Sequence, residues 1–311
     1  MMGSGKPDAG SARPAQRGKN YPQPAAGKLS GNRHFSIINH QSSIIHPKGF
    51  TLIELLVVIS IVVLLVAILL PSLQRVRRQA KAVGCQSNLR QAGVLFAIYA
   101  SDNNGKAPWG SLSDKGGAIS DPALVHVALF AGPSVDHRNL LLCPVASRPT
   151  EIPKAYWALG DTFSPWSLLI TPELTRELRP DLCIGSYGIN EWLIGPVSRS
   201  TLVLEENTNL REGARVPFYL DSIYWSTHLG QAPPPYEGCT SAAVGPNYSC
   251  INRHDGGVNC LFLDWSVRKV GLKELWTLKW YGHFDTAGPW TKRGGAEPED
   301  WPEWMRGFKD Y

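Results

Sequence analysis

Two polar residues near the end of the chain are of types that support catalysis or metal binding. His254 and Asp264 stand with nine residues between them. A histidine and a carboxylate can form an acid–base pair or contribute metal ligands. The apolar segment 258–263 between them reads as a strand, which would hold them about 30 Å apart if the chain were fully extended. We therefore predict a structural turn element, with His254 capping a turn and Asp264 forming an Asx turn, and no metal.

Six cysteines are the other reactive side chains, and they contain no Cys-x2-Cys pair of the kind found in zinc ribbons. In an exported domain an even set favours disulfides, and Cys239 with Cys250 would close a short loop. Fifteen pairings are possible, and spacing does not choose among them. Cys85 and Cys260 lie in apolar patterns and read equally well as buried thiols.

Familiar catalytic motifs are missing from the sequence. It has no Gly-x-Ser-x-Gly, no P-loop and no His-Glu-x-x-His. Residues 102–105, Asp-Asn-Asn-Gly, resemble part of a calcium loop but lack the distal Glu. We therefore predict that the protein is not an enzyme and binds no cofactor.

Charge is distributed unevenly over the 311 residues. The net charge is +5, but residues 1–48 carry seven Lys or Arg and one acid, so the remainder is close to neutral. This distribution argues against a basic face that binds nucleic acid. Residues 1–48 are also rich in Gly, Pro and Ser without an apolar period, and we interpret residues 1–49 as a disordered leader that is removed.

The elements that must position these residues begin with a long helix. All but three of residues 50–70 are apolar, and as a helix they span about 31 Å, the thickness of a bilayer core. After Pro71 the pattern becomes amphipathic, with apolar residues recurring at helical spacing in two series. The series are 73, 76, 80, 83 and 85, 89, 92, 96, 99. We predict one helix over 50–100 whose first half crosses a membrane, ending at the breaker 101–105.

The remaining residues, 101–311, favour a β-rich globular domain. Segments 216–220 and 258–263 read as strands, the second buried on both faces, and 253–257 as a hairpin turn before it. A short helix is expected within 272–280, followed by an irregular tail rich in tryptophan. The predicted fold class is α+β, with a long N-terminal helix packed against an antiparallel sheet.

The heptapeptide Lys48-Gly49-Phe50-Thr51-Leu52-Ile53-Glu54 resembles the cleavage and methylation site of type IV prepilins and type II secretion pseudopilins. The resemblance implies that prepilin peptidase cuts between Gly49 and Phe50 and methylates the new amine of Phe50. It also implies that Glu54 pairs with the terminal amine of a neighbouring subunit and sets the register between subunits. Pro71 takes the position of the family's helix kink.

Further motifs resemble a pseudopilin-like family abundant in planctomycetes. They comprise the helix end 85–105, Cys143-Pro144, the segment 186–190 and the segment 274–280. Members of that family carry a C-terminal His-x9-Asp-Gly element, which His254 and Asp264 match. Trp265 stands where the family has Gly, so the element is incomplete.

Together these features predict a structural pseudopilin-like subunit of a type II secretion or type IV pilus-like filament. Its partners would be prepilin peptidase, neighbouring pilin-like subunits of the same or another kind, and the inner membrane. The large domain would be periplasmic or extracellular. Basic residues at 75–81 favour the opposite orientation by the positive-inside rule, but the peptidase motif requires the leader inside. The alternative is a membrane-anchored periplasmic module whose tryptophans bind polysaccharide or secreted cargo.

Overall fold

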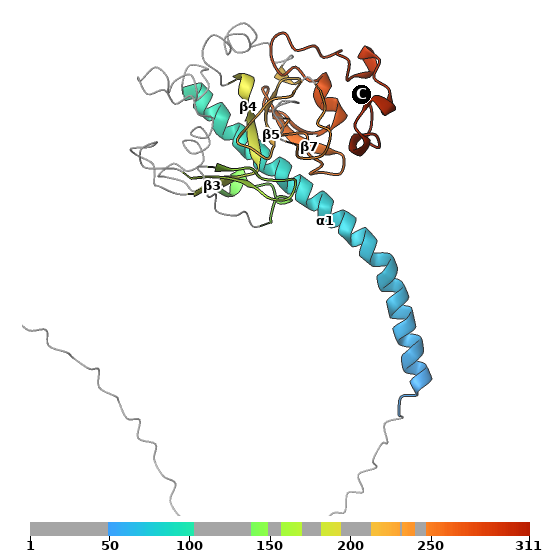
Figure 1. Cartoon of the computed structure of the whole chain (residues 1–311). Helices are drawn as coiled ribbons and strands as arrows, with labels where there is room; N and C mark the ends of the chain where they lie inside the picture. Colours follow the sequence, from blue (N-terminus) through green and yellow to red (C-terminus); the bar gives the residue numbers. More distant parts are fainter. Residues whose placement is uncertain are drawn as a thin grey trace, which may run out of the picture. The chain divides into compact units, whose positions relative to one another are not determined.

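The computed structural model describes residues 49–102, 138–148, 157–169, 182–193, 213–230, 232–239 and 247–311. The predicted leader 1–48 and the helix-breaking residues 103–105 lie outside this part of the chain. The described chain contains one α-helix, α1, which runs over Leu52–Asp102 and contains Pro71 without interruption (Figure 1). The prediction of a single helix ending at about residue 101 is therefore confirmed.

The chain divides into two units, Met1–Leu56 and Val57–Tyr311. The second unit holds most of α1 together with every described strand, so the later turns of the helix belong to the globular domain itself. The predicted α+β class is confirmed, because the strands after the helix pair almost entirely antiparallel.

Two sheets form the β part of the domain. The first has three antiparallel strands, β1 (Trp157–Ala158), β2 (Trp166–Leu169) and β3 (Leu182–Gly185). The second has five strands in the order β6-β4-β5-β7-β8. Their bounds are β4 Tyr187–Asn190, β5 Pro217–Asp221, β6 Ser226–Thr227, β7 Gly257–Phe262 and β8 Val267–Gly271. The β4–β6 pairing is parallel and the others are antiparallel.

The strands predicted at 216–220 and 258–263 correspond to β5 and β7. All six residues of β7 are buried, and it lies between β5 and β8, as its apolar sequence on both faces indicated. The predicted turn at 253–257 is present, with left-handed backbone at Asp255 (φ 47°) and Gly256 (φ 86°). It leads into β7, but the described residues directly before it, 247–252, form no strand, so it is not a hairpin between two strands.

The later turns of α1 pack against these sheets (Figure 1). Cys85, Leu89, Ala92 and Phe96 are buried in one core cluster with residues of β4 and β5. The Phe96 ring meets the Phe218 ring edge-on, with 4.8 Å between centroids. The spacing of this second apolar series therefore identified the packed face correctly.

The first apolar series does not pack in the same way. Leu73, Val76 and Val83 are 46%, 58% and 62% exposed, so the prediction that this stretch also lies under the domain is wrong. The domain first half-covers the helix at Ala82, whose carbonyl accepts from the Asn259 side chain (3.3 Å), and Cys85 is the first fully buried residue of α1.

Short 3-10 turns complete the chain. They are η1 (Arg138–Leu141), η2 (Glu191–Leu193), η3 (Lys273–Thr277), η4 (Lys292–Gly294), η5 (Pro298–Asp300) and η6 (Glu303–Met305). The predicted short helix after residue 272 is η3. The tail is irregular as expected, and it packs Trp301 edge-on against Trp276 with ring centroids 5.4 Å apart.

Candidate functional site

The start of α1 is a capping box built from Thr51 and Glu54. The Glu54 amide donates to the Thr51 hydroxyl (3.2 Å), and the Glu54 carboxylate accepts from the Thr51 amide (2.9 Å) and hydroxyl (2.9 Å). Ser or Thr with Glu three residues later satisfies donors that the first helical turn would leave unpaired. Glu54 therefore has a role within its own chain that we did not predict, although the Thr-x-x-Glu spacing encodes it.

Gly49 and Phe50 precede this box, and the fold makes no demand on either. A Cβ added to Gly49 would meet no atom within 4 Å, and Phe50 is 72% exposed. A glycine that its own fold does not require is available to a partner that needs close access to the backbone.

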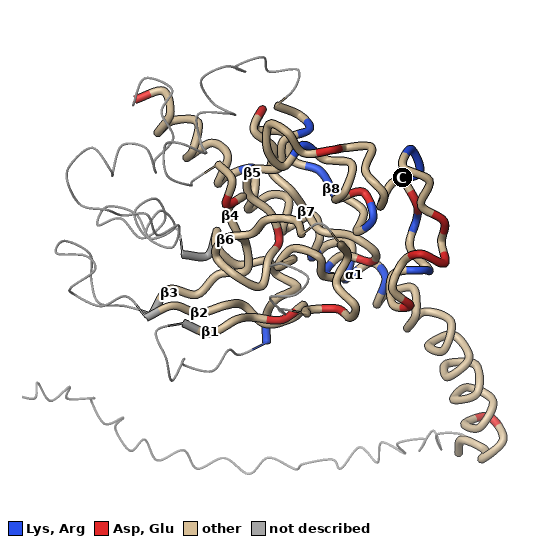
Figure 2. Tube along the Cα trace, turned by 45° about the horizontal axis from the view of Figure 1, so that its top comes forward, with Lys and Arg blue, Asp and Glu red and all other residues tan. Residues whose placement is uncertain are grey.

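The apolar half of α1 is uncovered. Every large apolar side chain from Leu52 to Leu70 is exposed, and within the described chain α1 is the one helix long and apolar enough to cross a membrane. In Figure 2 this part of α1 is tan, the colour of residues other than Lys, Arg, Asp and Glu, with red near its start. Glu54 is the acidic residue there. A surface of this size and uniformity is stable only against lipid or other apolar helices.

The structure separates His254 from Asp264. His254 lies in the turn before β7, where its amide donates to the Gly257 carbonyl (2.9 Å). Asp264 lies beyond the other end of β7 and accepts from the amide (3.0 Å) and hydroxyl (2.6 Å) of Ser266. Asp264 thus forms an Asx turn, whereas His254 contributes its backbone amide and not its side chain to the other turn, and β7 lies between the two residues.

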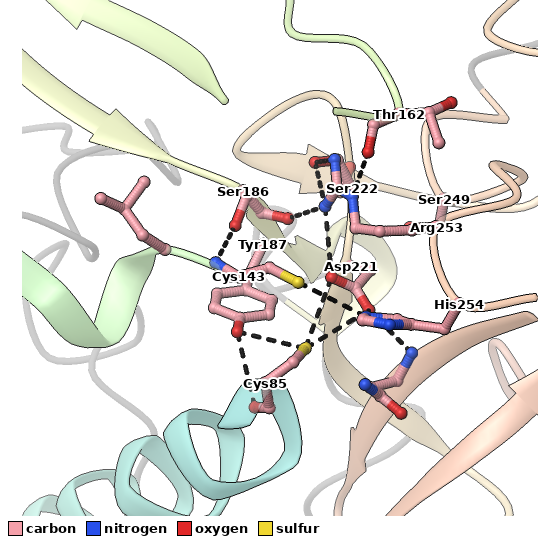
Figure 3. Close-up of polar contacts among 12 residues, drawn as sticks. Cys85, Cys143, Thr162, Ser186, Tyr187, Asp221, Ser222, Ser249, Arg253 and His254 are labelled. Carbon is pink, nitrogen blue, oxygen red and sulfur yellow. Dashed lines mark hydrogen bonds and ion pairs between the residues drawn. The ribbon is translucent and has the colours of Figure 1, made fainter. Parts of the chain in front are cut away.

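The His254 side chain is buried and contacts residues outside its own turn. Its Nε2 lies 3.0 Å from the Asp221 carboxylate and 3.4 Å from the Cys143 sulfur. The Cys85 sulfur lies 3.6 Å from the same carboxylate. Figure 3 shows these four side chains converging from α1, the segment after η1, the end of β5 and the turn before β7. We call Cys85, Cys143, Asp221 and His254 the buried polar cluster.

Arg253 and the backbone support this cluster from one side. Its guanidinium donates to the Asp221 carboxylate (3.2 Å), and the Asn259 amide donates to the same carboxylate (2.8 Å). Tyr187 donates its hydroxyl to the Cys85 sulfur (3.3 Å). The carboxylate is thus oriented by fixed donors before any ligand arrives.

The close packing of ionisable groups shifts their pKa values. Burial alone would raise the pKa of Asp221, but His254, Arg253 and the Asn259 amide outweigh it and hold the pKa below its usual value. Burial would likewise lower the pKa of His254, yet the Asp221 carboxylate raises it to about 9. Burial opposes ionisation of Cys143, but contacts with Cys85 and His254 lower its pKa to about 6. Burial raises the pKa of Cys85 well above its usual value.

All six cysteines lie in the described part of the chain, and all are buried free thiols. The expectation of disulfides, including one between Cys239 and Cys250, is therefore wrong for this structure. The alternative reading of Cys85 and Cys260 as buried thiols is confirmed. Burial raises the pKa of Cys250 and of Cys260, which keeps both thiols protonated and unreactive.

Spacing along the chain could not have found the buried polar cluster. Its members come from four segments that are distant in the sequence, and Asp221 carries no motif of its own. The only local signal is the His254 turn, which we had attributed to folding alone.

Comparison with known proteins gives matches at the N-terminus. The prokaryotic N-terminal methylation motif matches residues 46–70. The type IV wide pilus major component PilA4 of Thermus thermophilus is 44% identical over 59 residues, which are 19% of this chain and 45% of that protein. The ComG operon protein 3 homolog of Bacillus licheniformis is 32% identical over 63 residues, 20% of this chain and 65% of that protein.

These matches cover less than two thirds of the length of either relative, and no solved structure matches the chain significantly. The family match covers the methylation motif and the first part of α1. Within those limits the expected resemblance is confirmed: the chain is type IV pilin-like in its N-terminal region, which carries the prepilin methylation motif at the head of a single apolar helix.

Proposed function

We propose that this protein is a structural pilin-like subunit, cleaved after Gly49, methylated at Phe50 and assembled through α1 into a type II secretion or type IV pilus-like filament. The observation that carries the proposal is the methylation motif placed directly before an apolar, uncovered helix. Prepilin peptidase would process the leader, and the inner membrane would hold the subunit before assembly. The large domain would then lie on the periplasmic or extracellular side.

Two features of the motif support processing. The open space around Gly49 leaves the scissile peptide accessible, and the exposed Phe50 precedes the first helical residue, Leu52. A protease needs an unobstructed backbone at the bond that it cuts, and Gly49 and Phe50 are exposed and lie outside the helix.

Glu54 connects processing to assembly. A carboxylate at the centre of a membrane helix costs about 2.5–3.5 kcal/mol on insertion scales, so Glu54 must either lie near the membrane interface or pair with a cation. Thr51 supplies two hydrogen bonds but no charge. The methylated amine of a neighbouring subunit's first residue would supply the charge and would set the axial register between helices. Pro71 would then provide the kink one membrane thickness later.

The alternative of a membrane-anchored binding module is less well supported. That alternative rests on the number of tryptophans in the chain. The tryptophans whose burial the structure describes are buried or half-buried, and Trp166, Trp225 and Trp280 are among the buried ones. A polysaccharide-binding face needs exposed aromatic rings on which sugars can stack. Among the described aromatic residues of the domain, only Phe163 and Tyr236 are well exposed.

Two variants of Glu54 test the filament. Glu54→Leu removes both the charge and the capping box, whereas Glu54→Gln removes the charge and keeps an acceptor for the Thr51 amide. If the charge pairs between subunits, both variants should lose helix-to-helix photocrosslinks from a benzophenone amino acid at Val62, while cleavage continues. Removing one partner of a buried pair typically costs about 3–5 kcal/mol, which is enough to prevent assembly.

Other outcomes are equally informative. Crosslinking at the parental level in both variants would rule out the filament and leave the anchored module. Loss in the Leu variant alone would show that Glu54 acts through the capping box and not through a neighbour's amine.

A further inference from the structure

The buried polar cluster brings four metal-ligating side chains to one point. The ligand atoms of Cys85, Cys143, Asp221 and His254 all lie within 4.8 Å of one another. Each of the four residues is at most 5% exposed. Two sulfurs, an imidazole nitrogen and a carboxylate oxygen form a donor set that suits zinc better than calcium or magnesium, which prefer oxygen alone.

The separations are close to those of a tetrahedral shell. Ligands bound at about 2.0–2.3 Å from a central zinc ion lie about 3.3–3.8 Å from one another. Nε2 of His254 lies 3.0 Å from the carboxylate and 3.4 Å from the Cys143 sulfur, and the Cys85 sulfur lies 3.6 Å from the carboxylate. An ion would need only small side-chain movements to be bound by all four.

A cysteine protease-like triad does not fit the same residues. In such a triad the histidine meets the cysteine through one ring nitrogen and the carboxylate through the other. Here Nε2 faces both the Cys143 sulfur and the Asp221 carboxylate. Cys143 is also 1% exposed, so no substrate reaches it. A sulfur and a carboxylate oxygen that share one ring nitrogen are arranged as expected when all three atoms are ligands of one ion.

The formal charges of the surroundings agree with a divalent ion. Two thiolates and the Asp221 carboxylate carry three negative charges, and a divalent cation with the adjacent Arg253 supplies three positive charges. The supporting contacts also resemble those that orient metal ligands in general. Arg253 and the Asn259 amide hold the carboxylate, and the Tyr187 hydroxyl donates to the Cys85 sulfur.

We propose that Cys85, Cys143, Asp221 and His254 form a closed structural zinc site. This proposal replaces our expectation of a metal-free domain, and it is independent of processing and filament assembly. With four protein ligands and no open position, the site would stabilise the fold and would not catalyse a reaction. It would tie α1 to β5 and to the turn before β7, since Cys85 belongs to the helix, Asp221 ends β5 and His254 lies in that turn (Figure 3).

The test is metal analysis of the full chain in detergent, purified through a tag that does not bind metal and without chelators. We expect about one zinc ion per chain in the parent. Cys143→Ser and His254→Gln should each lose it. Cys260→Ser, which changes another buried cysteine outside the cluster, should keep it. Chelation should lower the melting temperature of the parent and of Cys260→Ser by several degrees.

Cobalt substitution of the parent keeps the test valid where a ligand variant fails to fold. The cobalt-loaded parent should show the intense visible bands of a tetrahedral ion and a thiolate-to-cobalt charge-transfer band. A reduced parent that carries no zinc and takes up neither zinc nor cobalt would overturn the proposal. A Cys85–Cys143 disulfide in unreduced protein, detected by peptide mass spectrometry, would overturn it as well.

Discussion

At the scale of single residues, the buried Arg253 side chain connects several segments of the chain through hydrogen bonds. It is 3% exposed, and its guanidinium donates to the carbonyls of Thr162, Ser186, Ser222 and Asp161 as well as to the Asp221 carboxylate. Asp221 ends β5, and the other four acceptors lie in the connections that follow β1, β3 and β5. A planar group with five donors can satisfy such a set, and few other side chains can.

We therefore expect Arg253→Lys to destabilise the domain although it conserves the charge. The ammonium has three donors on a flexible stem, so several buried carbonyls lose their partner, at a cost of about 2–4 kcal/mol in the free energy of unfolding. Denaturant unfolding of the full chain in detergent measures this loss. Arg268→Lys is the matched control, because the Arg268 pair with Glu274 is 42% exposed on the arginine side and should cost at most about 1 kcal/mol. Equal losses in the two variants would contradict this account of Arg253.

Trp265 is a second residue of interest, because its backbone conformation is unusual for a tryptophan. It occupies the left-handed region at φ 65°, at the position where the resembling family has Gly. Its ring packs edge-on against Phe218, with 5.6 Å between centroids. The tryptophan thus combines an unfavourable backbone conformation with favourable packing.

A pair of substitutions separates these two effects. Trp265→Gly and Trp265→Ala both remove the ring, but only glycine adopts this φ without strain. We expect the Gly variant to be more stable than the Ala variant by about 1 kcal/mol, the reverse of the usual order. Thermal unfolding of the two variants side by side measures the difference. An Ala variant as stable as the Gly variant would show that the turn relaxes when the ring is removed.

At the scale of elements, α1 joins two environments along one continuous helix. Its first half presents apolar side chains all round, and its last turns present a single packed stripe to the sheets. Contact is close where the stripe meets β7: a Cβ at Gly93 would lie 2.9 Å from a methyl of Leu261. Phe96 fills the next turn and packs on β5.

The packed stripe from Cys85 to Phe96 predicts unequal effects of truncation on opposite faces of α1. Phe96→Ala should cost about 3–5 kcal/mol of unfolding free energy, because Phe96 is 1% exposed and leaves a cavity against Phe218 and Tyr219. Val94→Ala, at a position that is 57% exposed, should change the same quantity by less than about 0.5 kcal/mol. Near-ultraviolet circular dichroism during denaturation follows both. A large loss at Val94 would mean that this face is covered by something other than the chain itself.

At the scale of the whole molecule, the prediction concerns the mature protein. Intact-mass analysis of membrane-extracted protein should find an N-terminus at Phe50 that carries one methyl group. Gly49→Val should block cleavage, because a branched side chain obstructs the backbone at the scissile bond.

Gly307→Val is the control for Gly49→Val, since a Cβ at either glycine would meet nothing within 4 Å in the fold. It should be processed like the parent. A parent that retains residues upstream of Lys48 would defeat the processing model, and normal cleavage of Gly49→Val would show that the peptidase does not need glycine there.

Local sequence patterns were sufficient to predict several elements of this protein. The apolar run 50–70, the stripe from Cys85 to Phe96 and the segment of β7 each carry their own periodicity, so helix, membrane-length span and buried strand could be predicted without a structure. The methylation motif is likewise contiguous, and the comparison with known proteins bears it out. Such features depend on interactions within a few residues, which the sequence displays directly.

Only the tertiary structure shows that the buried polar cluster exists and that the cysteines are free thiols. Cys85, Cys143, Asp221 and His254 meet because β5 and β7 pair and α1 packs across them, and no spacing along the chain encodes that meeting. The same packing leaves all six thiols free and buries tryptophans that we had considered for ligand binding. Convergence of distant segments is a property of the fold as a whole, because each ligand is positioned by an element whose own sequence says nothing of the other three.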